Sequence, residues 1–404
     1  MKSIVPLFAA LAIAFAPTGQ VQASAKDPHV QTAAAKTKAA KAKAAKAKAA
    51  KAKSKKDKAA GKRLALRSTK VLKAAPAAAV IDYDGEHHNF LEWQAVREFM
   101  DEMSTQHGFD RAYLESLFGQ ARFIDSAVQL VKPAPPGKPK NWQAYRDRFI
   151  EPIRIAAGVR FWNENAEALA RAEAAYGVPA EIIVGIIGVE TIYGRDTGKF
   201  RVLDTLATLA FAYPETPNRT ARMAFFRSEL ANTLIFAREH RVEPFSLLGS
   251  FAGAVGMPQF MPGNILKYGV DFNKDGQIDL RESSDDAIGS VANFLIQHGW
   301  NPEHRGSPVT PADVSPNHAW EPLLERGLKA TLRPEELRAA GVTTATALPA
   351  ERLYGLVDLQ NGAEATEYWV ADDNFFAITK YNRSYFYAMS VIELGRAVRA
   401  SRGG

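Results

Sequence analysis

One acidic side chain stands near the end of an apolar segment that runs from Val178 to Thr191. Pro179 suits the first turn of a helix and Glu181 suits its positive end, so the segment is predicted to be helical. Its side chains are apolar on nearly every side, which predicts a buried helix. Burying an ionised Glu190 would be strongly unfavourable unless the group is paired or protonated, and a carboxyl that keeps its proton is what general acid catalysis requires.

The same glutamate also has a purely structural interpretation. Glu190 could be neutralised by an ion pair with a basic side chain such as Arg195 or Arg222. A single Glu at the end of a helix does not distinguish the two interpretations, so the surrounding segments must decide.

Oxygen-bearing residues further along the chain follow the pattern of a calcium-binding loop. Residues 271–279 read DFNKDGQID, which matches D-x-[DN]-x-[DN]-G. Side-chain oxygens at loop positions one, three and five and a backbone carbonyl at position seven suit Ca²⁺, and these positions hold Asp271, Asn273, Asp275 and Gln277. Glu282 falls at position twelve, where an ordinary EF-hand has its last ligand. The alternative is a turn without metal.

A glycine-rich segment and a tyrosine-rich segment could bind a polar ligand. In GSFAGAVGMPQFMP (249–262), the glycines allow close backbone approach, Ser250 and Gln259 can hydrogen bond, and Phe260 offers an apolar face. The same small residues also suit a tight turn between packed helices. Tyr381, Asn382 and Tyr387 offer ring faces and an amide, although such a helix is more often part of a core.

Periodicity predicts a mainly helical protein with a smaller β-containing part. Helical spacing covers residues 90–130 and 142–300, and a proline-rich break separates the two. Residues 301–375 contain Pro, Gly and short β-branched runs, such as 342–346 and 353–359, which predict strands. Residues 375–398 are predicted to form one final helix.

Charge and composition describe the N-terminal part of the chain. Lys2, the apolar run from 4 to 16 and the small residues 23–25 predict a cleaved export signal. Residues 26–75, rich in Ala and Lys, carry a net charge of +15, whereas residues 76–404 carry −9. Such an arm is either a solvated spacer or a binder of anionic polymers. The chain has no cysteine, which excludes disulfides, thiol nucleophiles and Cys-ligated zinc.

Several long motifs, taken in order, resemble the membrane-bound lytic murein transglycosylase B family in a soluble form. The motifs span about 142–300 and 375–398, and they read GVETIYGRDTG, RVLDTLATLAF, GSFAGAVGMPQFMP, VDFNKDGQIDL, DAIGSVANFLIQHGW and ITKYNRS. The resemblance implies a mainly α (α+β) fold, with a lysozyme-like helical core, a flanking helical lobe and a small β-containing lobe.

The resemblance implies that Glu190 is the only catalytic acid and base. It would protonate the oxygen that joins N-acetylmuramic acid to N-acetylglucosamine and then accept the proton of the sugar's own 6-hydroxyl, which gives a 1,6-anhydro product. Ordinary glycosidases use two carboxylates, and no second one stands in the segment 249–262. The alternatives are a hydrolytic muramidase and a non-catalytic wall-binding scaffold.

The remaining expectations also follow from this resemblance. The substrate-binding residues would be Ser250, Gln259, Phe260, Tyr381, Asn382, Tyr387, Tyr145 and Arg222. Arg222 would meet an anionic stem peptide, or else pair with Glu190 or Glu229. Calcium would be structural, with Asp285 as its last ligand in preference to Glu282, and no organic cofactor is expected.

We expect a periplasmic monomer that acts on peptidoglycan glycan strands, has no transmembrane segment in its mature form and binds no specific nucleic acid. The expected divisions are a signal peptide (1–25), a basic arm (26–78), a helical lobe with the catalytic core (79–300), a small β-containing lobe (301–374) and a returning C-terminal helix (375–404).

Overall fold

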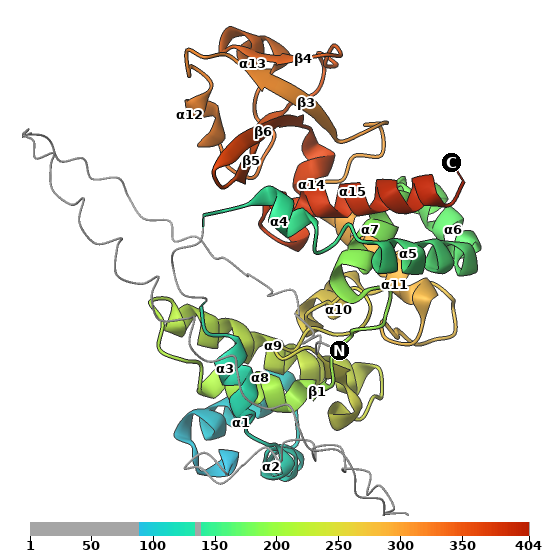
Figure 1. Cartoon of the computed structure of the whole chain (residues 1–404). Coiled ribbons are helices and arrows are strands. Elements are labelled where there is room, and N and C mark those ends of the chain that lie inside the picture. The colour runs from blue at the N-terminus through green and yellow to red at the C-terminus, as the bar shows by residue number, and fades with distance from the viewer. Residues whose placement is uncertain (1–88, 134–138, 404) are drawn as a thin grey trace, which may run out of the picture. The chain divides into compact units, whose positions relative to one another are not determined.

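The computed structural model describes residues 89–133 and 139–403 (Figure 1). The chain divides into two compact units, and all of these residues belong to one of them. The other unit, Phe15–Val80, lies outside the described residues, as do the predicted signal peptide and basic arm. Within the described part, no single helix is long and apolar enough to cross a membrane.

Fifteen α-helices account for most of the described residues, which confirms the predicted mainly helical α+β class. The helices are α1 (Gln94–His107), α2 (Arg111–Gln120), α3 (Asp125–Leu130), α4 (Trp142–Arg146), α5 (Pro152–Glu164), α6 (Ala166–Tyr176), α7 (Ala180–Thr191), α8 (Val202–Phe211), α9 (Arg219–Glu239), α10 (Pro262–Tyr268), α11 (Ser284–Gln297), α12 (Glu321–Leu324), α13 (Pro334–Ala339), α14 (Asp373–Tyr381) and α15 (Tyr385–Ser401).

The buried helix α7 lies at the centre of the larger, helical part. Every residue from Ile182 to Val189 is buried, as its apolar sequence predicts. In Figure 1 the red α15 runs beside the green α7, and two glycines bring the backbones together. A Cβ atom added to Gly185 would lie 2.2 Å from the Val391 carbonyl oxygen, and one added to Gly395 would lie 2.1 Å from that of Glu181. Only glycine fits this contact, so the two helices hold each other in one register.

The N-terminal helices attach to the same core through α8. The backbone N–H of Arg122 donates to Asp204 Oδ1 (3.0 Å), and that of Ile124 donates to Thr208 Oγ1 (3.0 Å). Both acceptors are buried side chains of α8. The segment between α2 and α3 is therefore fixed to α8 by buried polar contacts as well as by apolar packing.

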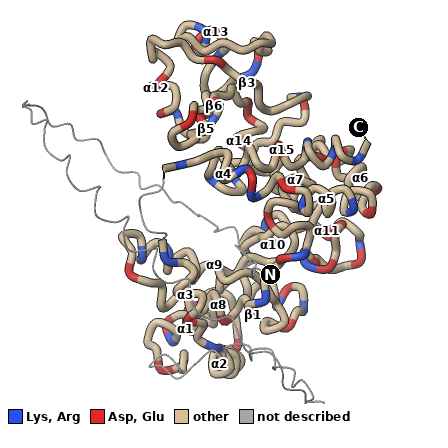
Figure 2. The backbone as a smooth tube through the Cα atoms, viewed as in Figure 1, with Lys and Arg blue, Asp and Glu red and all other residues tan. Residues whose placement is uncertain are grey.

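A four-stranded antiparallel sheet forms a smaller lobe with its own hydrophobic cluster. Its strand order is β4-β3-β6-β5. The strands are β3 (Val309–Val314), β4 (Val342–Thr344), β5 (Gly355–Asn361) and β6 (Glu364–Ala371), and a separate two-stranded ribbon joins β1 (Phe200–Arg201) to β2 (Leu248–Gly249). The cluster of the lobe consists of Trp320, Leu332, Leu337, Val342, Tyr354, Leu356 and Val370. Acidic and basic residues are interspersed on both the sheet lobe and the helices (Figure 2).

The end of the chain differs from the prediction of one helix over 375–398. The structure has two helices, α14 and α15, separated at Asn382–Ser384. Asn382 has an extended conformation, and the hydroxyl of Ser384 accepts the backbone N–H of Tyr387, which starts α15. The chain thus passes from α14 to α15 through a serine N-cap, without any Pro or Gly at the break. This break sets the relative positions of Tyr381 and Tyr387.

Candidate active site

Glu190 lies in the last turn of α7, where its carboxyl meets a tyrosine from α15. The hydroxyl of Tyr387 donates to Glu190 Oε1 at 2.7 Å. Glu190 as a residue is partly exposed. Burial nevertheless raises the pKa of Glu190 to about 7, against the opposing effects of the Tyr387 hydrogen bond and the positive charge of Arg154. Near neutral pH this carboxyl can therefore both give and accept a proton.

Three tyrosines from three different helices surround this carboxyl. The rings of Tyr381 and Tyr387 are stacked, with centroids 6.3 Å apart, and the Tyr381 hydroxyl donates to the Pro258 carbonyl oxygen at 2.6 Å. Burial, and next the charge of Glu190, raise the pKa of Tyr145 to about 12 and those of Tyr381 and Tyr387 well above the ordinary value. These hydroxyls therefore stay protonated and can only donate or share hydrogen bonds at neutral pH.

The glycine-rich segment is tied directly to the end of α7. The hydroxyl of Thr191 donates to the Met257 carbonyl oxygen (2.8 Å) and accepts the backbone N–H of Gly194 (3.0 Å). Ile192 and Tyr193, which follow, have positive φ angles of 52° and 57°. Positive φ in two consecutive bulky residues is uncommon and costs conformational energy, so strong local contacts must hold this turn.

Ser250 and Gln259 both lie in this segment and already hydrogen bond to the backbone. The hydroxyl of Ser250 accepts the N–H of Ala254 at 3.0 Å. The amide of Gln259 donates to the carbonyl oxygens of Thr197 (3.2 Å) and Gly256 (2.9 Å). These bonds use the Gln259 Nε2 hydrogens, so the side chain has its carbonyl oxygen available as an acceptor.

The other predicted binding residues have varied surroundings. Phe260 is only 1% exposed and packs its ring 5.8 Å from that of Tyr381, so it supports the tyrosine instead of offering an open face. Asn382 directly follows Tyr381 at the end of α14 and is partly exposed. Arg222 is 8% exposed on α9, with its guanidinium 5.5 Å from the ring centre of Tyr213.

The charged group that acts on Glu190 is Arg154, and neither Arg195 nor Arg222 takes that place. Arg154 was not predicted as a site residue, because it lies 36 positions before Glu190 and only the fold brings α5 to the end of α7. The start of a helix at Pro152 was the one local signal, and it carries no information about what the helix contacts.

Known proteins are similar to this chain over most of its length. A model of the transglycosylase SLT domain family matches residues 92–396. Membrane-bound lytic murein transglycosylase B of Escherichia coli strain K12 is 44% identical over 316 residues, which are 76% of this chain and 83% of that protein. The crystal structure of soluble lytic transglycosylase SltB1 from Pseudomonas aeruginosa aligns with a TM-score of 0.70 at 44% identity, covering 77% of this chain and 100% of that one. E. coli lytic transglycosylase Slt35, solved in complex with calcium, aligns with a TM-score of 0.69 at 41% identity, covering 78% of this chain and 96% of that one.

The chain belongs to this transglycosylase family. It is a lytic murein transglycosylase, an enzyme that cleaves the glycan strands of peptidoglycan. The family match includes the sheet lobe between the two stretches in which the motifs were found. The resemblance drawn from the motifs is confirmed, and the relationship covers more of the chain than the motifs did.

The candidate calcium loop of this transglycosylase has converging oxygens. Asp271 Oδ1 and Asn273 Oδ1 both accept the backbone N–H of Asp275, at 3.1 and 3.0 Å. Asp275 Oδ1 accepts the N–H of Gln277 at 2.8 Å. Gly276 has a φ of +88°, the turn that position six needs. The first half of the loop therefore has side-chain oxygens and a positive-φ glycine at the positions that the sequence pattern predicts.

The second half of the loop has its acids turned to other partners. Asp285 forms an ion pair with Arg171, and Glu282 lies 3.4 Å from Arg281 and is largely exposed. The fully buried Asp286 instead accepts the backbone N–H groups of Phe272 (2.9 Å) and Asp279 (2.9 Å). Among residues 89–133 and 139–403, no three His, Cys, Asp or Glu side chains form a metal cluster.

Proposed function

We propose that Glu190 acts alone as the acid and then the base of this transglycosylase. Its protonated carboxyl would give a proton to the bridging oxygen between N-acetylmuramic acid and N-acetylglucosamine while the C1–O bond breaks. The resulting carboxylate would then take the proton of the C6 hydroxyl as O6 bonds to C1, which closes a 1,6-anhydro ring and restores the starting enzyme. No water is consumed.

The observation that carries this proposal is that Glu190, which accepts a hydrogen bond from Tyr387 and is surrounded by tyrosines, has a pKa of about 7. An acid and base used in succession works best when its pKa lies near the operating pH. The groups that shift Glu190 are Tyr387 and Arg154, and no other carboxylate within the described residues is among them. A second carboxylate would be needed to activate water in an inverting hydrolase or to bind the sugar covalently in a retaining one.

We propose that the substrate lies along Tyr145, Tyr381, Tyr387 and Asn382 on one side and the segment 249–262 on the other. Tyrosine rings give stacking faces for sugar rings, and amide and hydroxyl groups bind acetamido and hydroxyl groups. Ser250 and Gln259 are the polar side chains of that segment, and Thr191 holds it against the end of α7. Arg222 is a weaker candidate, because it is 8% exposed and its Nε already donates to the Tyr213 hydroxyl at 3.3 Å.

Mass spectrometry of digested sacculi tests the reaction. We expect muropeptides with 1,6-anhydro ends, and reducing-end muramic acid would indicate a hydrolytic muramidase instead. Glu190→Gln should lower the release of muropeptides by at least about 10²-fold, the usual contribution of a general acid. Glu181→Gln is a matched control on the same helix, because Glu181 pairs with Arg399 at the opposite end of α7. Undiminished release by Glu190→Gln would contradict the proposal, and a protein that binds sacculi without releasing anything would be a scaffold.

We propose that the loop from Asp271 binds Ca²⁺ through Asp271, Asn273, Asp275 and the carbonyl of Gln277, and that Asp285 completes the site by leaving Arg171. The support is the converging oxygens and the calcium complex of Slt35. Ca²⁺ should raise the melting temperature and EDTA should reverse the effect. Asp285→Asn should abolish this response and Glu282→Gln should not. The opposite pattern would make Glu282 the last ligand.

We propose, from the sequence of its N-terminus, that the enzyme is exported to the periplasm. The basic arm would bind anionic envelope polymers through its charge of +15. Deleting residues 26–75 should weaken retention on anionic sacculi at low salt and should not change the turnover of short glycans. Retention that is unchanged and insensitive to salt would contradict a binding role.

A further inference from the structure

Arg154 joins the beginning of α5 to the last turn of α7. Its side chain is 11% exposed. Its Nη1 donates to the carbonyl oxygens of Gly188 (2.7 Å) and Val189 (3.1 Å). Val189 is the residue directly before Glu190, so this guanidinium holds the backbone from which the catalytic carboxyl extends.

The end of α7 needs such a donor. The last carbonyl groups of a helix have no partner within the helix, and a cation there is favourable because the helix dipole is negative at that end. After Thr191 the chain turns through positive φ angles at Ile192 and Tyr193, so it leaves the helical path. The Val189 carbonyl thereby loses its helical partner and is bonded by Arg154.

The guanidinium of Arg154 is itself held in place. Glu151 accepts the backbone N–H of Arg154 at 2.6 Å, and its Oε1 lies 4.0 Å from the Arg154 Nε. The guanidinium also lies 5.1 Å from the centre of the Phe149 ring, and that ring lies 5.2 Å from the ring of Tyr145. Arg154 therefore contacts both the helix that carries Glu190 and the ring of Phe149, which packs against Tyr145.

We propose that Arg154 is a positioning residue for catalysis: it fixes the last turn of α7, and with it the carboxyl of Glu190, and keeps a positive charge beside that carboxyl. The inference deepens the proposed function and rests on Glu190 being the acid. A carboxyl that must serve first as an acid and then as a base needs one fixed location and a charge environment that allows both forms.

Four charged or titratable side chains lie close enough to Glu190 to interact with its charge. Glu190 faces Arg154 from α5, Tyr145 from α4, Tyr381 from α14 and Tyr387 from α15. Arg154 in turn faces Glu151, Tyr193 and Asp196. Burial lowers the pKa of Arg154, and the guanidinium remains charged near neutral pH. Removing this charge removes one of the two effects that lower the pKa of Glu190.

The test compares kcat/KM as a function of pH for Arg154→Gln, Arg154→Lys and Arg160→Gln. Arg160 is an exposed residue of α5, so its substitution removes the same charge from the same helix away from Glu190. We expect Arg154→Gln to lose about 10²-fold in kcat/KM, since a displacement of about 1 Å in a catalytic group costs that much. The alkaline limb of its kcat/KM profile should move to higher pH, because Glu190 without the neighbouring positive charge stays protonated up to a higher pH.

Arg154→Lys should keep the alkaline limb of the wild-type enzyme, because the charge remains, and should recover only part of the rate, because one ammonium cannot reproduce the fixed fork of guanidinium donors. Arg160→Gln should match the wild type in both respects. If Arg154→Gln does not fold, Arg154→Met, which keeps an unbranched stem without charge, replaces it. A charge-free variant that folds and keeps the wild-type limb and rate overturns the inference.

Glu190→Gln, measured beside these variants, separates this inference from the proposed function. An active Glu190→Gln would remove the proposed role of Glu190 itself. An inactive Glu190→Gln together with unchanged Arg154 variants would leave the role of Glu190 intact and would refute the positioning role of Arg154 alone.

Discussion

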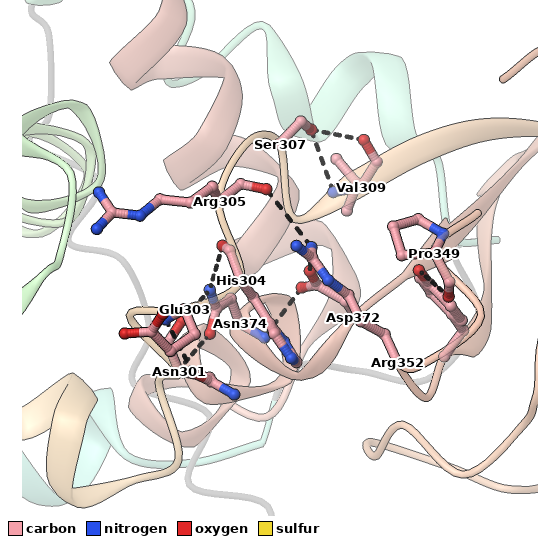
Figure 3. Close-up of polar contacts among 11 residues, drawn as sticks. Asn301, Glu303, His304, Arg305, Ser307, Val309, Pro349, Arg352, Asp372 and Asn374 are labelled. Carbon is pink, nitrogen blue, oxygen red and sulfur yellow. Dashed lines mark hydrogen bonds and ion pairs between the residues drawn. The ribbon is translucent and has the colours of Figure 1, made fainter. Parts of the chain in front are cut away.

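Glu190 and Asp372 are two carboxyl groups whose pKa values burial raises, to about 7 and about 6, but they have different partners. Asp372 is 3% exposed and accepts the backbone N–H of Asn374 (3.0 Å) and the Nη1 of Arg352 (3.3 Å). Figure 3 shows it between these two groups, at the junction of the sheet lobe and α14. Asp372 caps a helix and completes an ion pair, which are structural roles.

The surroundings of Asp372 form a closed network. The Asn374 side chain donates to the Asn301 carbonyl oxygen (3.0 Å) and accepts the N–H of Asn301 (2.6 Å), which fastens the start of the sheet lobe to α14 (Figure 3). Glu190 has instead one hydrogen bond from Tyr387 and as a residue is partly exposed. A raised pKa by itself therefore does not identify a catalytic acid. The partial exposure and the tyrosines distinguish Glu190.

Removing the carboxyl group of Asp372 should have the largest effect on stability. Asp372→Ala leaves Arg352 buried without its partner and should lower the free energy of unfolding by about 3–5 kcal/mol, as for other buried ion pairs. Denaturant unfolding measures this loss. Asp373→Ala is the control, because the neighbouring carboxylate lies in the first turn of α14 and should contribute less than about 1 kcal/mol. Equal losses for the two variants would show that the ion pair is not the source of the effect.

Removing the hydroxyl next to Glu190 should affect activity more than stability. Tyr387→Phe removes a hydrogen bond to the carboxylate, which should lower kcat/KM by about tenfold and move the alkaline limb of the pH profile to higher pH. The sign follows because this bond stabilises the ionised form of Glu190. Tyr385→Phe is the control, since its hydroxyl donates to the Gly327 carbonyl oxygen in the sheet lobe. A limb that stays in place would mean that the Tyr387 hydroxyl does not control the protonation of Glu190.

The sequence alone predicted the parts of this enzyme that depend on local composition. The apolar run of α7 predicts a buried helix, and Glu190, the acid in its last turn, is partly exposed. Burial raises the pKa of Glu190, which is the expected consequence of an acid among apolar side chains. The motifs around it resembled the correct family, so both the mainly helical class and the murein-cleaving activity could be predicted.

Features that depend on contacts between distant segments were not predicted. The runs named from the sequence overlap β4 and β5 but include neither β3 nor β6. Pro311 lies within β3, where it pairs with β6 just before the pairing with β4 begins at Ala312. The break between α14 and α15 was missed because a serine cap makes it without Pro or Gly. Arg154 was missed because nothing in the sequence around it indicates that its side chain hydrogen bonds to the carbonyl oxygens at the end of α7.

Making Glu190 neutral should change stability in the direction opposite to Asp372→Ala. The pKa of Glu190 is about 7 in the folded enzyme and about 4.3 in an unfolded chain, so the folded state binds more protons between these values. Stability is therefore highest below about pH 4.3 as far as this group is concerned, and it falls as the pH rises toward and through about 7. Glu190→Gln does not titrate and avoids this loss.

The difference in melting temperature between Glu190→Gln and the wild-type enzyme should thus be positive at pH 8 and smaller at pH 5, as measured by differential scanning calorimetry in the same buffers. Asp372→Ala should be less stable than wild type at both pH values, because it breaks an ion pair. If Glu190→Gln instead lowered the melting temperature at pH 8, the carboxylate of Glu190 would be a favourable structural partner, as that of Asp372 is, and the contrast between the two acids would be lost.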